Sequence, residues 1–164
     1  MKTLLIIRHA KSSWGDLTLD DFDRPLNDRG KRDAPVMARR LLDKKIIIDQ
    51  FVSSPAKRAK KTAVLFAREY KAGEDKIVLK TELYEASRQT FYAIVSGLDN
   101  SVENIALFSH NPGITDFANS LTDTRVDDMP TCAIFAIRMS AGSWADFPST
   151  AKEFWFFDYP KLVE

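Results

Sequence analysis

The stretch LLIIRHAKSSW, residues 4–14, is the clearest sign of the fold in this sequence. Four consecutive aliphatic residues are typical of a strand buried on both faces, yet the run stops abruptly at Arg8 and His9. A second apolar run, in IALFSHNPG at residues 105–113, stops in the same way at His110. The chain contains two histidines, and each of them follows such a run.

Short apolar runs alternate with longer amphipathic segments along the rest of the chain. Strands are expected at residues 3–7, 50–53, 77–83 and 104–109. Helices are expected at residues 27–45, 54–70, 87–98 and 112–121. Asn27 is the expected N-cap of the first helix, and Ser54 that of the second, with Pro55 as its first helical residue.

The C-terminal part of the chain has a different pattern. The runs CAIFAIRM (132–139) and EFWFFDY (153–159) are rich in β-formers and predict two strands that complete one edge of the sheet, antiparallel to their neighbours. Together with the strand–helix alternation, they predict an α/β fold. We expect a three-layer α/β/α sandwich with a mostly parallel sheet and an antiparallel C-terminal edge, in a single domain over residues 1–164.

Composition excludes several classes of function. With 24 basic and 23 acidic residues, the net charge is +1, which gives no support to a nucleic-acid or membrane partner. No stretch approaches the length of a membrane span, and we expect a cytoplasmic protein. The single cysteine, Cys132, lies in an apolar run, which favours a buried, inert thiol over a nucleophile.

The polar residues at the strand ends suggest one shared site. In open α/β sheets, ligands bind outside the carboxyl ends of the strands. The polar residues at or just beyond the ends of the expected strands are Arg8, His9, Ser53, Ser54, Arg58, Glu82, Glu85, Ser109 and His110. Guanidinium groups match the geometry of phosphate, and a neutral histidine beside bound phosphate can attack phosphorus.

Other interpretations of these residues are weaker. A zinc site made by His9, His110 and a carboxylate would place a cation beside two arginines that repel it. The acidic segment GDLTLDDFDRPL at residues 15–26 is read as an exposed loop, since it lacks the spacing of a calcium-binding loop. The lysines around Arg58, in KRAKKTA (57–63), are expected to form a solvated helix face.

Four motifs resemble those of the histidine phosphatase superfamily, which has the phosphoglycerate mutase-like fold. They are RHAKSSW, SSPAKRAKKTA, LYEAS and FSHNPGI, and they extend over most of the chain. RHAKSSW has Ala10 where the family motif has glycine. The compact length, together with DRPLNDRG and HNPGITDFAN, is most similar to the SixA-type phosphohistidine phosphatases.

The resemblance implies a role for each matching residue. His9 would take up a phosphoryl group, while Arg8, Arg58 and His110 would bind the phosphate. Glu85 would protonate the leaving group and then activate water, although Glu82 lies close enough to compete for this assignment. The resemblance implies no metal and no organic cofactor.

The substrate is the most open part of this hypothesis. The resemblance implies a phosphohistidine carried by a signalling or phosphotransfer protein. Two alternatives are a phosphatase or mutase acting on a small phosphorylated metabolite, and a catalytically weak phospho-binding module on the same fold. Short connections after His9, and between Glu85 and His110, argue against the large insertions that cap the site in mutases.

Overall fold

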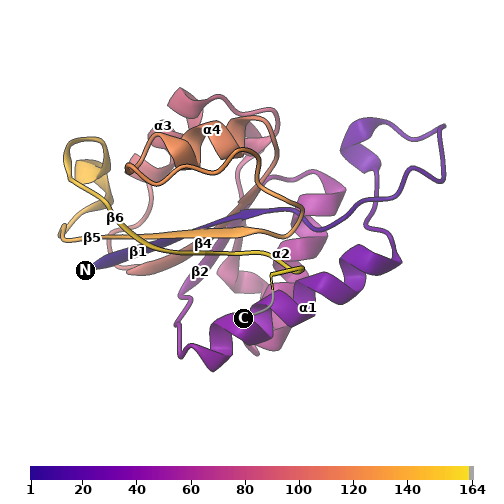
Figure 1. The fold of residues 1–164 in the computed structure, drawn as a ribbon, viewed down its shortest axis with the longest axis horizontal. Coiled ribbons are helices and arrows are strands. Elements are labelled where there is room, and N and C mark those ends of the chain that lie inside the picture. The colour runs from indigo at the N-terminus through magenta and orange to yellow at the C-terminus, as the bar shows by residue number, and fades with distance from the viewer. Residues whose placement is uncertain (163–164) are drawn as a thin grey trace.

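The computed structural model describes residues 1–162 and contains one six-stranded sheet with helices on both faces (Figure 1). The strands are β1 (Lys2–Arg8), β2 (Gln50–Ser53), β3 (Ile77–Leu79), β4 (Asn104–Ser109), β5 (Ile134–Met139) and β6 (Glu153–Asp158). The helices are α1 (Asp28–Asp43), α2 (Lys57–Glu69), α3 (Arg88–Ser96) and α4 (Gly113–Asn119). Helices α3 and α4 cover one face of the sheet, and α1 and α2 cover the other.

The sheet is mixed in the way the sequence predicts. Its strand order is β3-β2-β4-β1-β5-β6. Strands β3, β2, β4 and β1 are parallel neighbours, whereas β5 is antiparallel to both β1 and β6. The C-terminal runs therefore form the antiparallel edge, and the predicted α/β/α fold class is confirmed.

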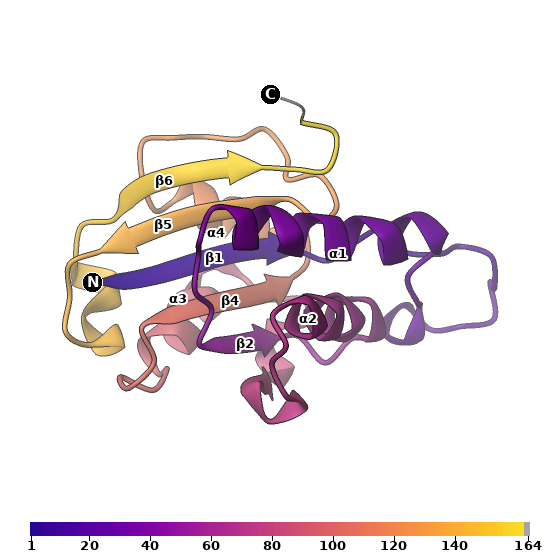
Figure 2. The ribbon, with the colours of Figure 1, turned by 90° about the horizontal axis from the view of Figure 1, so that it is seen from below.

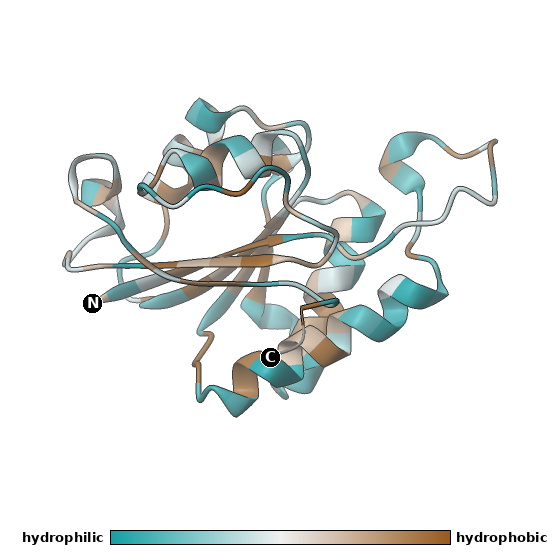
Figure 3. Ribbon diagram, viewed as in Figure 1, coloured by the Kyte–Doolittle hydropathy of each residue, from teal (hydrophilic) through white to brown (hydrophobic). Residues whose placement is uncertain are grey.

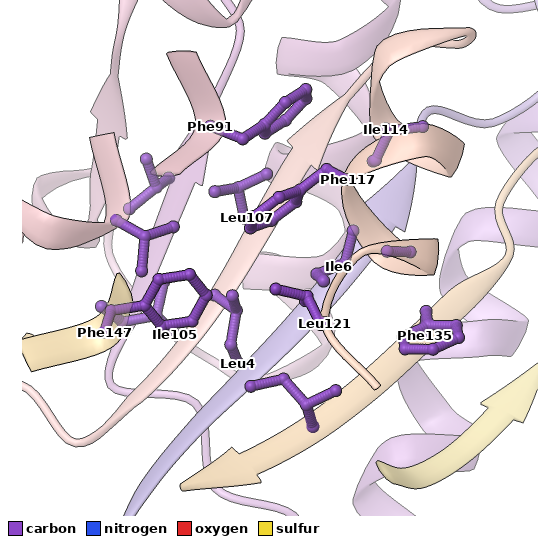
Figure 4. Packing of buried hydrophobic residues seen from close by; sticks show 14 of the residues in the cluster. Leu4, Ile6, Phe91, Ile105, Leu107, Ile114, Phe117, Leu121, Phe135 and Phe147 are labelled. Carbon is purple, nitrogen blue, oxygen red and sulfur yellow. The ribbon is translucent and has the colours of Figure 1, made fainter. Parts of the chain in front are cut away.

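Side chains of the central strands point alternately to the two faces of the sheet, so the core is divided into two layers. Leu4 and Ile6 of β1 pack in the same cluster as Phe91 of α3 and Phe117 of α4 (Figure 4). Leu5 and Ile7 face the opposite way, toward α1 and α2. Because both faces are covered, the strands read as continuous apolar runs, which appear as the brown centre of Figure 3.

Several expected boundaries differ from the structure by two residues or more, including the start of α2, the end of β3 and the start of β5 at Ile134 rather than Cys132. Helix α2 begins at Lys57 after an Ala56 N-cap, not at Pro55 after Ser54. The Ser54 hydroxyl accepts a hydrogen bond from the Ala56 N–H and also contacts His110, so it stabilises a turn rather than a helix end. Strand β3 ends at Leu79 and not at Leu83, because its neighbour β2 ends at Ser53.

The parallel strands point their carboxyl ends toward one side of the molecule. In Figure 2 the arrows of β1, β2 and β4 run in the same direction, toward the long loop that joins β1 to α1. That loop extends beyond the end of the sheet (Figure 1). The residues after these three strands are therefore neighbours in space although they are distant in sequence.

Within residues 1–162, no helix combines the length and apolar character that crossing a bilayer requires.

Candidate active site

One pocket lies at this carboxyl edge of the sheet and has a volume of about 810 Å³. Its lining includes all five residues assigned above to catalysis or phosphate binding, which are Arg8, His9, Arg58, Glu85 and His110. These residues come from four separate segments of the chain, and the topology of the sheet brings them together. Cys132, in contrast, is fully buried, and burial raises the pKa of its thiol above its ordinary value.

The contacts of His9 determine which of its two ring nitrogens carries the proton. Its Nδ1 lies 2.7 Å from the Ala10 carbonyl oxygen, which is only an acceptor, so the ring proton sits on Nδ1. The lone pair therefore lies on Nε2, which accepts a hydrogen bond from Arg58 Nε at 3.3 Å. Ala10 has no positive φ, which explains why alanine can replace the family's glycine there.

Arg58 and the lysines beside it have different environments on α2. Arg58 is 5% exposed and turns its guanidinium group into the pocket, whereas Lys57 and Lys60 are exposed. Successive residues point in different directions around a helix axis, so adjacent positions can lie on a buried and on a solvated face. The prediction of a solvated lysine face is confirmed for these two residues.

His110 lies beside His9, with 5.1 Å between the ring centroids. Its Nε2 is 2.8 Å from Ser54 Oγ, which already accepts from the Ala56 N–H. Among the described residues, His110 Nε2 is the acceptor within reach of the Ser54 hydroxyl proton, so the hydroxyl donates to Nε2 and the ring proton sits on Nδ1. This Nδ1 is buried and has no hydrogen-bond partner among residues 1–162, so it is a free donor.

Arg8 has a similarly unsatisfied group. Its Nη1 donates to the Met129 carbonyl at 2.9 Å, while its buried Nε has no partner among the described residues. Arg8 Nε and His110 Nδ1 belong to two residues that line the same pocket. Buried donors without partners indicate a site shaped for a ligand rich in acceptor oxygens.

Electrostatics keeps both histidines neutral. Burial lowers the pKa of His9 to about 3, and the positive charges of Arg58 and Arg8 act in the same direction. Burial and the nearby arginines likewise lower the pKa of His110 to about 3. At neutral pH, His9 Nε2 therefore carries a lone pair rather than a proton, as a nucleophile must.

The neutral state of both rings gives a first prediction. Because the chain contains two histidines, each ring can be assigned separately in a spectrum. In ¹⁵N-histidine NMR spectra, both rings should remain neutral at pH 6, with His9 as the Nδ1–H tautomer. Because the unfolded chain binds protons near pH 6.5 and the folded chain only near pH 3, the free energy of unfolding should also fall as pH drops through this window. A titration midpoint near 6.5 for either ring would contradict the assignment.

Of the two candidate acids, Glu85 lines the pocket and Glu82 does not. Glu82 is exposed and lies on the 3₁₀ turn Thr81–Leu83. Glu85 is exposed and has a φ of 58°, an uncommon conformation for a residue with a side chain. At Gly113, a Cβ would overlap the Ala86 carbonyl oxygen, so this glycine allows the segment after Glu85 to approach α4 closely.

The pocket also contains polar residues to which the sequence analysis gave no role, among them Asp21, Arg24 and Tyr84. The first two lie in the loop interpreted only as exposed and acidic. Arg24 stacks on Trp14, with its guanidinium carbon 3.8 Å from the ring centroid, and also donates to Ser12. Arg24 lies in DRPLNDRG and Tyr84 in LYEAS, two segments that carry the family resemblance, whereas Asp21 lies in neither.

No group of three His, Cys, Asp or Glu side chains gathers as a metal ion would require, among the residues that the structure describes.

Comparison with known proteins places this chain in a family. The sequence model of the histidine phosphatase superfamily, branch 1, matches residues 4–93. The uncharacterized protein Rv1276c of Mycobacterium tuberculosis is 30% identical over 151 residues, covering 85% of this chain and 90% of its own. The uncharacterized protein ML1117 of Mycobacterium leprae is 28% identical, over 94% of this chain and 100% of its own.

Solved structures show the same fold. The protein histidine phosphatase SixA, in complex with tungstate, superposes with a TM-score of 0.82 at 20% identity, over 96% of this chain and 97% of its own. The mycobacterial glucosyl-3-phosphoglycerate phosphatase Rv2419c superposes with a TM-score of 0.69 at 16% identity, over 94% and 97%.

The chain belongs to the histidine phosphatase superfamily, branch 1. Its fold is SixA-like, in agreement with the resemblance seen in the sequence.

Proposed function

We propose that this protein is a metal-independent phosphatase that works through a phosphohistidine intermediate on His9. The observation that carries the proposal is the position of His9 Nε2. It is unprotonated, it accepts from Arg58 Nε, and its residue lines the same pocket as Arg8, Arg58 and His110. Such donors stabilise the charge on a transferring phosphoryl group, which is where most of the catalysis of phosphoryl transfer lies.

In the first step, His9 Nε2 forms a bond to phosphorus as the bond to the leaving group breaks. Before this, the Arg58 Nε–H must turn from His9 to a phosphate oxygen, which frees the lone pair of the nucleophile. The leaving group takes a proton from the carboxyl group of Glu85. In the second step, Glu85 accepts a proton from water, the water oxygen attacks phosphorus, and the N–P bond breaks to release inorganic phosphate and restore His9.

For the substrate, we infer a phosphohistidine on the surface of a protein. Of the eight large apolar side chains that are most exposed within residues 1–162, four lie in the loop after β1: Trp14, Leu17, Leu19 and Phe22. Trp14 also lines the pocket, so this apolar surface continues into the site. A small metabolite does not reach such a surface, whereas a folded protein presenting a phosphorylated residue does.

A substrate panel tests this choice with the variant Leu17→Ser, which removes a side chain that is 87% exposed. The expected result is a fall of about 10-fold in kcat/KM for a phosphohistidine-bearing protein and no change for p-nitrophenyl phosphate, because only the protein reaches the loop. The matched control is Ile47→Ser, a 65% exposed apolar residue at the opposite end of the sheet. If sugar phosphates are the better substrates and Leu17→Ser changes nothing, a small metabolite is the substrate.

The similarity to a glucosyl-3-phosphoglycerate phosphatase favours that second candidate. Lys11 and Arg88 line the pocket in addition to the phosphate-binding arginines and could bind an anionic group of a small substrate. Arg88 is, however, already paired with Asp116 through two contacts of 3.1 and 2.6 Å. The protein substrate therefore remains our first proposal.

A further inference from the structure

The Asp21 carboxylate lies against the group that should bind phosphate. Its Oδ2 accepts from Arg58 Nη2 at 3.0 Å and from the Tyr84 hydroxyl at 2.7 Å, and its Oδ1 accepts from Arg24 Nη2 at 3.0 Å. Two guanidinium groups and a phenol thus converge on one anionic group. This is the donor set that an oxyanion entering the pocket would meet.

Asp21 keeps its charge in this position. Burial opposes ionisation, but the hydrogen bonds from Tyr84, Arg24 and Arg58 outweigh it and hold the pKa of the carboxyl group well below its ordinary value. A second anion that approaches Arg58 therefore meets a fixed negative charge at every pH near neutrality. The Asp21 side chain is 51% exposed, so it lies at the mouth of the pocket rather than beneath it.

We propose that Asp21 is a specificity-determining residue that competes with free inorganic phosphate for Arg58, an inference that rests on the proposed role of Arg58 in phosphate binding. Free phosphate has no contacts other than those of the phosphoryl site, so it bears the full repulsion from the carboxylate. A phosphoryl group carried by a larger substrate is also held by contacts outside that site, such as the exposed loop. Asp21 thereby lowers inhibition by the product relative to binding of the substrate.

The chain offers a clean variant for this test. In Asp21→Asn the carboxylate charge is lost, but the Asp21 backbone carbonyl still accepts from Arg58 Nη1, a contact of 2.6 Å that anchors the loop. The loop base is held independently, by the Ser13 N–H on the Pro25 carbonyl at 2.8 Å and the Asn27 N–H on the Lys11 carbonyl at 3.0 Å. The variant should therefore fold, and Asp21→Ser repeats the test if the amide disturbs the contacts with both arginines.

The measurement is the Ki of inorganic phosphate against p-nitrophenyl phosphate hydrolysis. Asp21→Asn should lower this Ki about 10-fold, since a like charge beside the bound anion has been removed. Asp21→Glu keeps the charge and should keep the Ki within about 2-fold of wild type. Asp23→Asn is the matched control, because Asp23 lies on the same 3₁₀ turn, is exposed and does not line the pocket, and its Ki should not change.

Calorimetric titration of Arg58→Ala with phosphate separates the two hypotheses. If this variant binds phosphate as tightly as wild type, Arg58 does not bind phosphate. The role of Arg58 in the proposed function is then wrong, and so is the inference about Asp21. If Arg58→Ala loses phosphate binding while the Ki in Asp21→Asn is unchanged or higher, Asp21 does not compete with phosphate. In that case the proposed function stands and this inference alone is overturned.

Discussion

Replacing His9 by alanine should abolish turnover, with a loss of at least ~10⁴-fold in kcat, the scale seen when a covalent nucleophile is removed. The structure gives the reason. His9 Nε2 is an unprotonated nitrogen that accepts from Arg58 Nε, whereas His110 lines the same pocket with a free N–H. During turnover by the wild-type enzyme, ³²P from the substrate should appear on His9 in an acid-labile, base-stable linkage.

The position of the label decides between nucleophiles. Ser12 lines the pocket and is bound to Arg24, so Ser12→Ala is the matched control and should retain the label on His9. Peptide mapping after a rapid quench would locate the phosphoryl group. Label on Ser12, Ser13 or Cys132 would show that the assignment of His9 is wrong.

The second large effect is expected at Arg58. Arg58→Ala should lower kcat/KM by at least ~10²-fold, the cost of one lost donor to a developing oxyanion. The loss should be this large because Arg58 is buried and acts at three points: its Nε reaches His9, and its two Nη atoms hold the loop through Asp21. Arg58→Lys should recover little, since an ammonium group cannot reproduce the planar fork.

Lys60→Ala supplies the control on the same helix. Lys57 and Lys60 are exposed, and Lys61 is only partly buried, so their substitution should leave hydrolysis of p-nitrophenyl phosphate unchanged. Any effect should be confined to protein substrates and should weaken as salt is added. Equal losses at Arg58 and the three lysines would contradict the division between a buried and a solvated face of α2.

Much of the architecture follows from local patterns in the sequence. The buried run at residues 4–7 predicts a strand covered on both faces, and Asn27 caps α1 by accepting from the Gly30 N–H at 2.8 Å, as expected. The run EFWFFDY predicts a strand, which β6 confirms, and its aromatic residues are half-buried and pack against the core clusters on both faces of the sheet. These features are readable because burial and capping depend on residues close together in the chain.

The gathering of the candidate site could also be anticipated, because parallel strands end at the same edge of a sheet. From the positions of Arg8, His9, Arg58, Glu85 and His110 after successive strands, a shared pocket was predicted, and the structure contains one. The roles of these residues came from the family resemblance, and they stay predictions until the variants above are measured.

Features that depend on distant contacts were decided only by the tertiary structure. Strand β3 stops where its partner β2 stops, and the Ser54 hydroxyl faces His110, 56 residues away, rather than capping a helix. Asp21 looked like one of several exposed carboxylates, yet it meets Arg58 across 37 residues and Tyr84 across 63. No local pattern encodes such meetings, because a hydrogen bond between distant segments forms only once the packed sheet and helices have set the distance and angle between its partners.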